Sequence, residues 1–186
     1  MAACGIAPSA RTAFDARIRQ LQRLGVPQRD DANTGRIDYG VAELAGLATA
    51  VRLMAAFMVP SLAARYVTER WAVLVPALMA GAGSALPADY VARRSIGETT
   101  IFAIAAGALS DLGRQKRHDE RYTGALGELV LVDRAALPET IDGFGGAGLV
   151  IDTATYMPVI VDGFAAAAMA TNSELAHQLD RLRFYA

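Results

Sequence analysis

Arginine side chains are concentrated near the start of the chain, where their chemistry could serve an anionic partner. The stretch from Arg11 to Gly40 holds six of the 18 basic residues in the 186-residue sequence. A guanidinium keeps its charge and presents a planar fork of donors, which suits bidentate contact with phosphates or with the edge of guanine. The stretch is therefore either a solvated surface or a surface that grips an anion.

A helix is expected to position the first of these arginines. The pattern predicts a helix over residues 10–24, with Ser9 as its N-cap and with Gly25 and Pro27 ending it. Its apolar residues share one face, which we expect to join the core. The opposite face collects the candidate binding residues of the helix, which are Arg11, Thr12, Arg19, Gln22 and Arg23.

A turn and a short extended piece should follow this helix. Asn33, Thr34 and Gly35 are typical of turns, and the letters "RIDY" favour an extended segment, so together they predict a small hairpin or wing. The binding candidates in or beside this wing are Arg29, Arg36 and Tyr39. Apolar spacing then predicts a long helix from Val41 to about Phe57 and another that restarts at Pro60.

The second half of the chain has a different pattern. Short β-prone runs predict strands at about 99–105, 128–132 and 149–151, with Asp133 and Asp152 or Thr153 capping the turns after the last two. Helices are expected over 153–169 and 173–184, the second capped by Asn172 or Ser173. The predicted fold class is mainly α with an α+β C-terminal half, a small sheet of about three strands with covering helices. The predicted domains are 1–80 and 90–186.

Residues that could support catalysis or metal binding are few and scattered. The two histidines, His118 and His177, have polar neighbours, and the single cysteine, Cys4, cannot form a disulfide within one chain. The glycine-rich letters "GFGGAG" at 143–148 lack the lysine of a P-loop and precede a strand, which indicates a connection. The charged run 114–121 is interpreted as a solvated loop. We expect no enzyme, cofactor or metal.

Charge and hydropathy restrict the classes of protein further. The net charge is −1, yet residues 1–95 hold 11 arginines against 7 acids, whereas residues 96–186 hold 7 basic against 12 acidic residues. This asymmetry suggests a basic working end and an acidic remainder. The apolar runs Val41–Pro60 and Ala72–Leu86 are interrupted or short, so we expect buried helices and not membrane spans. The start lacks secretory features, and a cytoplasmic location is expected.

The segment from Phe14 to Trp71 resembles the DNA-binding region of MerR-type regulators. That region has a recognition helix with an Ile-Arg pair and a later glycine, then a wing ending in R-x-x-Y, then a long and a shorter helix. The matching residues are Ile18, Arg19, Gly25, Val26, Arg29, Arg36 and Tyr39. Gln20 stands where the family usually has tyrosine, and no helix before Ser9 corresponds to the family's first helix.

The resemblance implies an N-terminal winged helix that binds double-stranded DNA as a homodimer and regulates transcription. Dimer contacts are expected in the C-terminal half, through a sheet edge or the helix at 153–169, and that half is also the candidate place for a small-molecule effector or a protein partner. The alternative is a phage- or plasmid-linked adaptor that uses the same N-terminal surface on a protein. Salt dependence distinguishes the two, because binding through arginines weakens steeply as salt rises.

Overall fold

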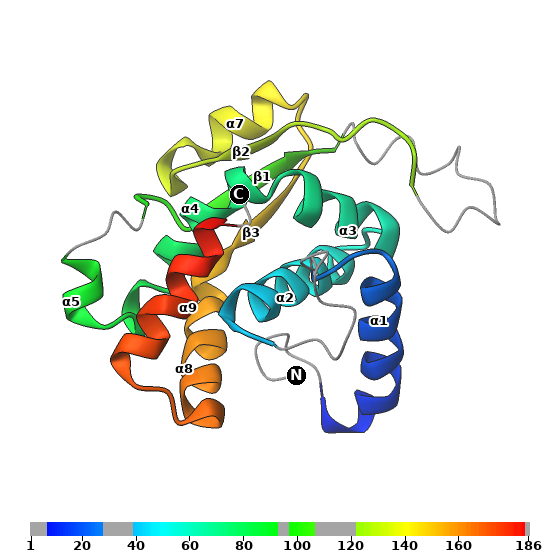
Figure 1. Ribbon diagram of the computed structural model, residues 1–186. Coiled ribbons are helices and arrows are strands. Elements are labelled where there is room, and N and C mark those ends of the chain that lie inside the picture. The colour runs from blue at the N-terminus through cyan, green and yellow to red at the C-terminus, as the bar shows by residue number, and fades with distance from the viewer. Residues whose placement is uncertain (1–6, 28–38, 93–96, 107–121, 185–186) are drawn as a thin grey trace.

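A computed structural model describes residues 7–27, 39–92, 97–106 and 122–184 (Figure 1). The first half is helical: η2 (Pro8–Ala10), α1 (Arg11–Arg23), α2 (Val41–Ala55), α3 (Pro60–Glu69), α4 (Trp71–Gly81), η3 (Gly83–Ala85) and α5 (Ala88–Val91). The second half contains β1 (Ile101–Ala105), β2 (Leu129–Leu131), η5 (Arg134–Ala136), α7 (Leu137–Gly143), β3 (Gly148–Asp152), η6 (Thr153–Thr155), α8 (Met157–Ala168) and α9 (Asn172–Phe184). The protein is thus mainly helical with one small sheet.

The sheet is antiparallel in the order β2-β1-β3, and both faces of its central strand are covered. Phe102 and Ile104 of β1 belong to the main core, whereas Ile101 and Ala103 form a smaller cluster with Val132. Leu137 of α7 and Phe144 just after it pack on that smaller cluster, and Figure 1 shows α7 on the side of the sheet away from the helical body. Two covered faces explain why β1 has a continuous apolar run.

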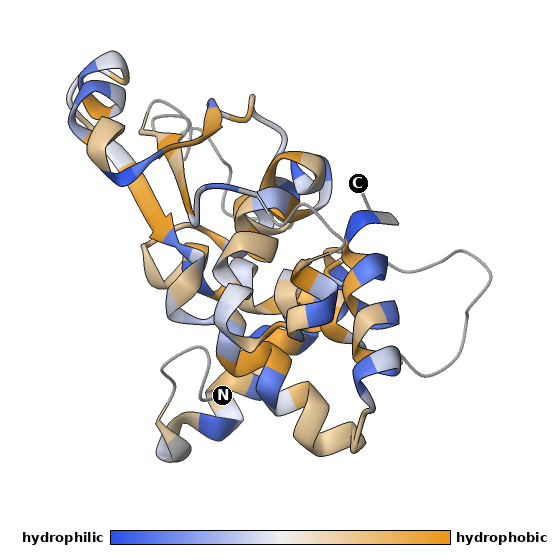
Figure 2. Ribbon diagram, turned by 90° about the vertical axis from the view of Figure 1, so that its left-hand side faces the viewer, coloured by the Kyte–Doolittle hydropathy of each residue, from blue (hydrophilic) through white to orange (hydrophobic). Residues whose placement is uncertain are grey.

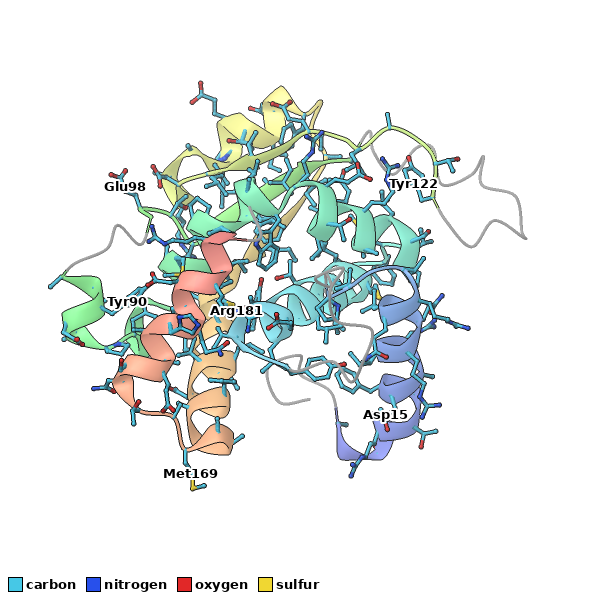
Figure 3. The ribbon with its side chains drawn as sticks, viewed as in Figure 1. Asp15, Tyr90, Glu98, Tyr122, Met169 and Arg181 are labelled. Carbon is cyan, nitrogen blue, oxygen red and sulfur yellow. The ribbon has the colours of Figure 1, made fainter. Side chains whose placement is uncertain are left out.

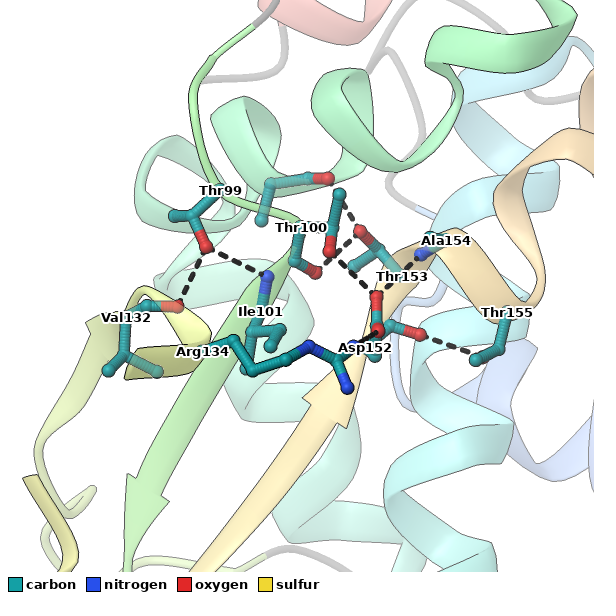
Figure 4. A network of polar contacts seen from close by, with 10 residues as sticks. Thr99, Thr100, Ile101, Val132, Arg134, Asp152, Thr153, Ala154 and Thr155 are labelled. Atoms are coloured by element: carbon teal, nitrogen blue, oxygen red, sulfur yellow. Dashed lines mark hydrogen bonds and ion pairs between the residues drawn. The ribbon is translucent and has the colours of Figure 1, made fainter. Parts of the chain in front are cut away.

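A buried threonine joins the sheet to the helical body (Figure 4). The Thr153 hydroxyl lies 2.6 Å from the carbonyl oxygen of Ala77 in α4 and 2.8 Å from that of Thr100, just before β1. Its single hydrogen is thus shared between two acceptors. A Cβ at Gly81 would lie 2.7 Å from the backbone carbonyl carbon of Thr153, so only glycine lets α4 approach this closely.

Asp152, next to this threonine, organises the polar surface beside the junction. One carboxylate oxygen accepts hydrogen bonds from the Thr100 hydroxyl at 2.8 Å and from the Ala154 amide at 3.1 Å. The other forms an ion pair with Arg134 at 2.9 Å. Asp152 therefore caps η6 as predicted.

Helix α9 connects the end of the chain to the first helices. Trp71 at the start of α4 donates its indole N–H to the carbonyl oxygen of Leu182 at 2.9 Å. Arg181 pairs with the buried Glu43 of α2 at 3.1 Å, and Glu43 also accepts from the Gly40 amide at 2.9 Å. Leu179 and Leu182 are fully buried, while the charged residues of α9 appear as blue bands beside the C-terminal label in Figure 2. One core thus includes residues from both predicted domains.

The turn between α2 and α3 contains an aromatic residue in an unusual conformation. Phe57 has a φ of 67°, in the left-handed region, and its side chain is exposed, at 95 % relative accessibility. The amide of Phe57 donates to the Met54 carbonyl and that of Met58 to the Leu53 carbonyl, which together form a Schellman motif. Glycine usually occupies this position, because a Cβ there adds strain.

Most predicted elements are present, with corrections at the caps. The three strands and the helices α1, α2, α3, α8 and α9 lie where the patterns predicted them. Ser9 does not cap α1, since it lies within η2 and no side chain bonds the first turn. Asp133 makes no capping bond either, and α9 is capped by Thr171, whose hydroxyl accepts from the Glu174 amide at 3.3 Å. None of the described helices is both long and apolar enough to span a membrane.

The predicted wing falls largely in residues 28–38, outside the residues that the structure describes. The winged-helix identity of the N-terminal region and the division into domains 1–80 and 90–186 stay predictions. The glycine-rich letters at 143–148 end α7 and lead into β3, so the interpretation as a connection is confirmed.

Replacing Thr153 with valine tests the junction between sheet and helices. Thr153→Val keeps the shape but removes the hydroxyl that donates to the buried Ala77 carbonyl, while the Thr100 carbonyl still accepts from the Thr153 amide, so we expect a loss of about 1 kcal/mol in the free energy of unfolding. Urea denaturation measures it. Thr155→Val is the matched control, because that hydroxyl bonds an exposed carbonyl of Asp152. Equal losses in the two variants would contradict the assignment.

Replacing Phe57 with glycine should stabilise the protein. Phe57→Gly relieves left-handed strain at no packing cost, so we expect a gain of about 1 kcal/mol in unfolding free energy. Phe57→Ala, which removes the ring but keeps a Cβ, should change stability much less. A gain of the same size in both variants would attribute the effect to the ring and not to the backbone.

Candidate nucleic-acid interface

Helix α1 is held to the body of the protein along one face only. Leu21 is fully buried, and Phe14, Ile18 and Leu24 are half-buried against the core. The chain then turns at Gly25, whose φ is 88°, and the buried Val26 donates its amide to the Leu21 carbonyl at 2.9 Å. The C-terminal end of α1 is therefore anchored, as the apolar spacing predicted.

The opposite face of α1 is exposed and basic. Arg11, Thr12, Arg19 and Arg23 are all exposed, and none of the three arginines forms an ion pair with a described residue. Asp15, labelled in Figure 3, is the sole acidic residue of α1. These arginines are hydrated cations, so a partner that binds them need not first break an existing ion pair.

Two of the predicted binding residues contact each other. The amide nitrogen of Gln22 donates to the hydroxyl of Tyr39, and both side chains are half-buried. The contact links the end of α1 to the residue that precedes α2 by two positions. Gln22 and Tyr39 therefore position the ends of the intervening segment, in addition to any contact with a partner.

Several sequence predictions fall outside the described residues. Arg29 and Arg36 lie in 28–38, His118 and the charged run 114–121 lie in 107–121, and Cys4 lies in 1–6. His177 is on the exposed side of α9. Across the described ranges, no three His, Cys, Asp or Glu side chains are grouped as metal ligands.

A cleft opens beside the C-terminal end of α1. It has a volume of about 500 Å³, and segments far apart in the sequence form its walls. They are the end of α1 with Arg23 and Leu24, the side of α3 that carries Ser61 and Arg65, and the segment around Tyr122, at the upper right of Figure 3. The only cleft wall that the binding prediction included is the end of α1.

Arg65 organises the wall between α3 and the Tyr122 segment. Its guanidinium makes two bonds with the Glu69 carboxylate, at 2.6 and 2.9 Å, and donates to the Gly124 carbonyl at 2.5 Å. It also lies 5.7 Å from the centroid of the Tyr122 ring. Sequence reasoning missed this residue, because its partners are separated from it by almost 60 positions and only the spacing to Glu69 was visible.

Ionisation in this wall follows from the same contacts. The hydrogen bonds from Arg65 lower the pKa of Glu69, so the carboxylate stays charged and its contribution to stability is present at neutral pH and lost as the pH falls. Burial raises the pKa of the neighbouring Tyr66 to about 12, which keeps that phenol neutral. The wall thus presents a neutralised ion pair at physiological pH.

Replacing Arg65 with lysine tests the role of the several hydrogen-bond donors of its guanidinium. Arg65→Lys keeps the charge, but one ammonium cannot reach the Glu69 carboxylate and the Gly124 carbonyl together, so we expect a loss of about 1–2 kcal/mol in unfolding free energy. Arg70→Lys, at an exposed neighbouring position, is the control. Urea denaturation measures both variants. If they are equally stable, the several donors of the Arg65 guanidinium contribute nothing to stability.

Comparison with known proteins gives no relative for this chain. No protein-family model, curated protein or solved structure matches it. Its function is therefore inferred from the geometry and charge of its own residues.

Proposed function

We propose that the protein is a sequence-specific DNA-binding regulator of transcription, acting as a homodimer in the cytoplasm. In this proposal α1 lies in the major groove, as the resemblance to MerR-type regulators implies. The observation that supports it is the exposed face of α1 with Arg11, Arg19 and Arg23, which have no acidic partner among the described residues.

The energetics of arginine binding favour this use of the surface. A guanidinium that already holds a carboxylate must break that pair before it binds a phosphate, whereas a hydrated guanidinium loses only water. Each phosphate that is neutralised releases condensed counterions, which adds affinity at low salt. Since the whole chain has a net charge of −1, attraction to DNA must come from a local surface, and α1 is such a surface.

Dimerisation belongs to the same proposal. One short helix makes few base contacts, so useful specificity normally requires two copies on a two-fold site. Helix α8 is the candidate contact, because Val159 within it and Met169 at its C-cap are exposed, and its last turn consists of alanines. Met169 is labelled at the bottom of Figure 3. The edge strands β2 and β3 are the other candidate contact.

A protein-interaction adaptor is the second candidate. The exposed Phe57 favours it, because an aromatic side chain that is left in solvent is the kind of residue that anchors protein interfaces. In that function, binding would depend on the ring and would vary little with salt.

Removing two arginines from α1 tests the DNA-binding function. Arg19→Ala combined with Arg23→Ala should weaken binding to DNA selected from a random library by roughly tenfold or more, with an unchanged melting temperature. If each arginine neutralises one phosphate, the slope of log affinity against log salt should fall by about 1.8. Fluorescence anisotropy over a salt series measures both quantities.

A control with the same loss of charge makes the test specific. Arg70→Ala combined with Arg134→Ala removes two exposed arginines outside α1 and should bind DNA as the parent does. Equal affinity of the α1 variant and the parent would refute the proposal. A parent protein that selects no DNA sequence, together with a salt-independent protein partner lost in Phe57→Ala, would favour the adaptor.

A further inference from the structure

We propose that the cleft between α1, α3 and the Tyr122 segment is a binding site for a small organic molecule with one negative charge. The cleft volume of about 500 Å³ is in the range of small-molecule sites, which ordinarily have a few placed polar groups among apolar walls. No part of the DNA-binding proposal requires this cleft, and only Gln22 and Arg23 belong to both surfaces.

The charges of the walls determine the sign of the ligand. Arg65 and Glu69 form a two-bonded pair, so their charges cancel to a first approximation. The C-terminal end of α1 contributes a partial negative charge of roughly half an elementary charge. Arg23 contributes a full positive charge and has no ion pair with a described residue, so the balance favours a single anionic group.

Uncharged groups in the walls indicate the other chemical features of the ligand, which are a hydrogen-bond acceptor and an apolar part. Ser61 is a buried residue in the first turn of α3, and its hydroxyl has no hydrogen-bond partner among the described residues. It can donate to a carboxylate or a similar oxygen acid held by Arg23. The side chain of Leu24 supplies an apolar surface for a hydrocarbon or aromatic part of the molecule.

A regulatory consequence follows, and it rests on the proposed DNA-binding function. Arg23 lies on the exposed face of α1 and also lines the cleft, so one guanidinium serves two anionic partners. A ligand that holds Arg23 withdraws it from the DNA phosphates. Occupation of the cleft should therefore weaken DNA binding, and by linkage DNA should weaken binding of the ligand.

Benzoate and benzamide form a probe pair of matched size and different charge. Isothermal titration of the intact protein without DNA should detect benzoate and give at least tenfold weaker binding of benzamide. Arg23→Gln should weaken benzoate binding by roughly tenfold or more, because a charge-assisted hydrogen bond is lost. Arg19→Gln is the matched control, an exposed arginine one helical turn away that does not line the cleft, and it should bind benzoate as the parent does.

Three results would overturn the site. They are no benzoate binding at millimolar concentration, equal binding of benzoate and benzamide, or equal losses in Arg23→Gln and Arg19→Gln. Ser61→Leu, which fills the cleft, should abolish binding, and if it does not fold, Ser61→Ala should still weaken it severalfold. Because these measurements contain no DNA, they can succeed where the DNA-binding test fails. Benzoate that binds yet leaves DNA affinity unchanged would overturn the regulatory consequence alone.

Discussion

The close approach of Thr153 to helix α4 is the constraint on which the arrangement of sheet and helices depends. Its hydroxyl donates to the Ala77 carbonyl of α4 and shares the Thr100 carbonyl with its own amide, and the absence of a side chain at Gly81 makes room for it. A buried hydroxyl that lost these acceptors would cost more than an ordinary hydrogen bond contributes. The two layers therefore have one favourable relative position, and η6 and α8 continue from it to cover the core.

Helix α1 stands outside this constraint, which is why its arginines are available. The buried core is built from α2, α3, α4, α8, α9 and the sheet, whereas α1 contributes Leu21 and a half-buried stripe. The arginines Arg11, Arg19 and Arg23 on the basic face of α1 form no ion pair with the described residues, and of the candidates on that face Gln22 alone bonds another element, through Tyr39. The walls of the neighbouring cleft are different, because Arg65 is fully engaged there and holds the Tyr122 segment in place.

Local patterns predicted the elements well, and long-range contacts decided the rest. Helical periodicity placed α1, α2 and α3, short β-prone runs placed all three strands, and Gly25 marked the end of α1 correctly. Periodicity cannot reveal that Thr153 bonds a carbonyl 76 positions earlier, or that Arg65 meets Gly124. The left-handed backbone conformation of Phe57 could not be predicted either, because a bulky residue rarely adopts it. The two cleft walls formed by α3 and the Tyr122 segment were missed because long-range contacts bring them to α1, whereas the arginine face follows from the periodicity of α1 alone.

The contacts of α9 mean that the helical core can be completed only late in the synthesis of the described residues. Leu179 and Leu182 complete the core of the first helices. Trp71 donates to the Leu182 carbonyl of the same helix, and Glu43 accepts from its Arg181. A ribosome adds residues one at a time, so α2 and α4 emerge long before the helix that covers them. Until then their apolar faces remain open to water and to other nascent chains. The cell must therefore tolerate, or shield, an unfinished helical core from the time that α4 emerges until α9 has been synthesised.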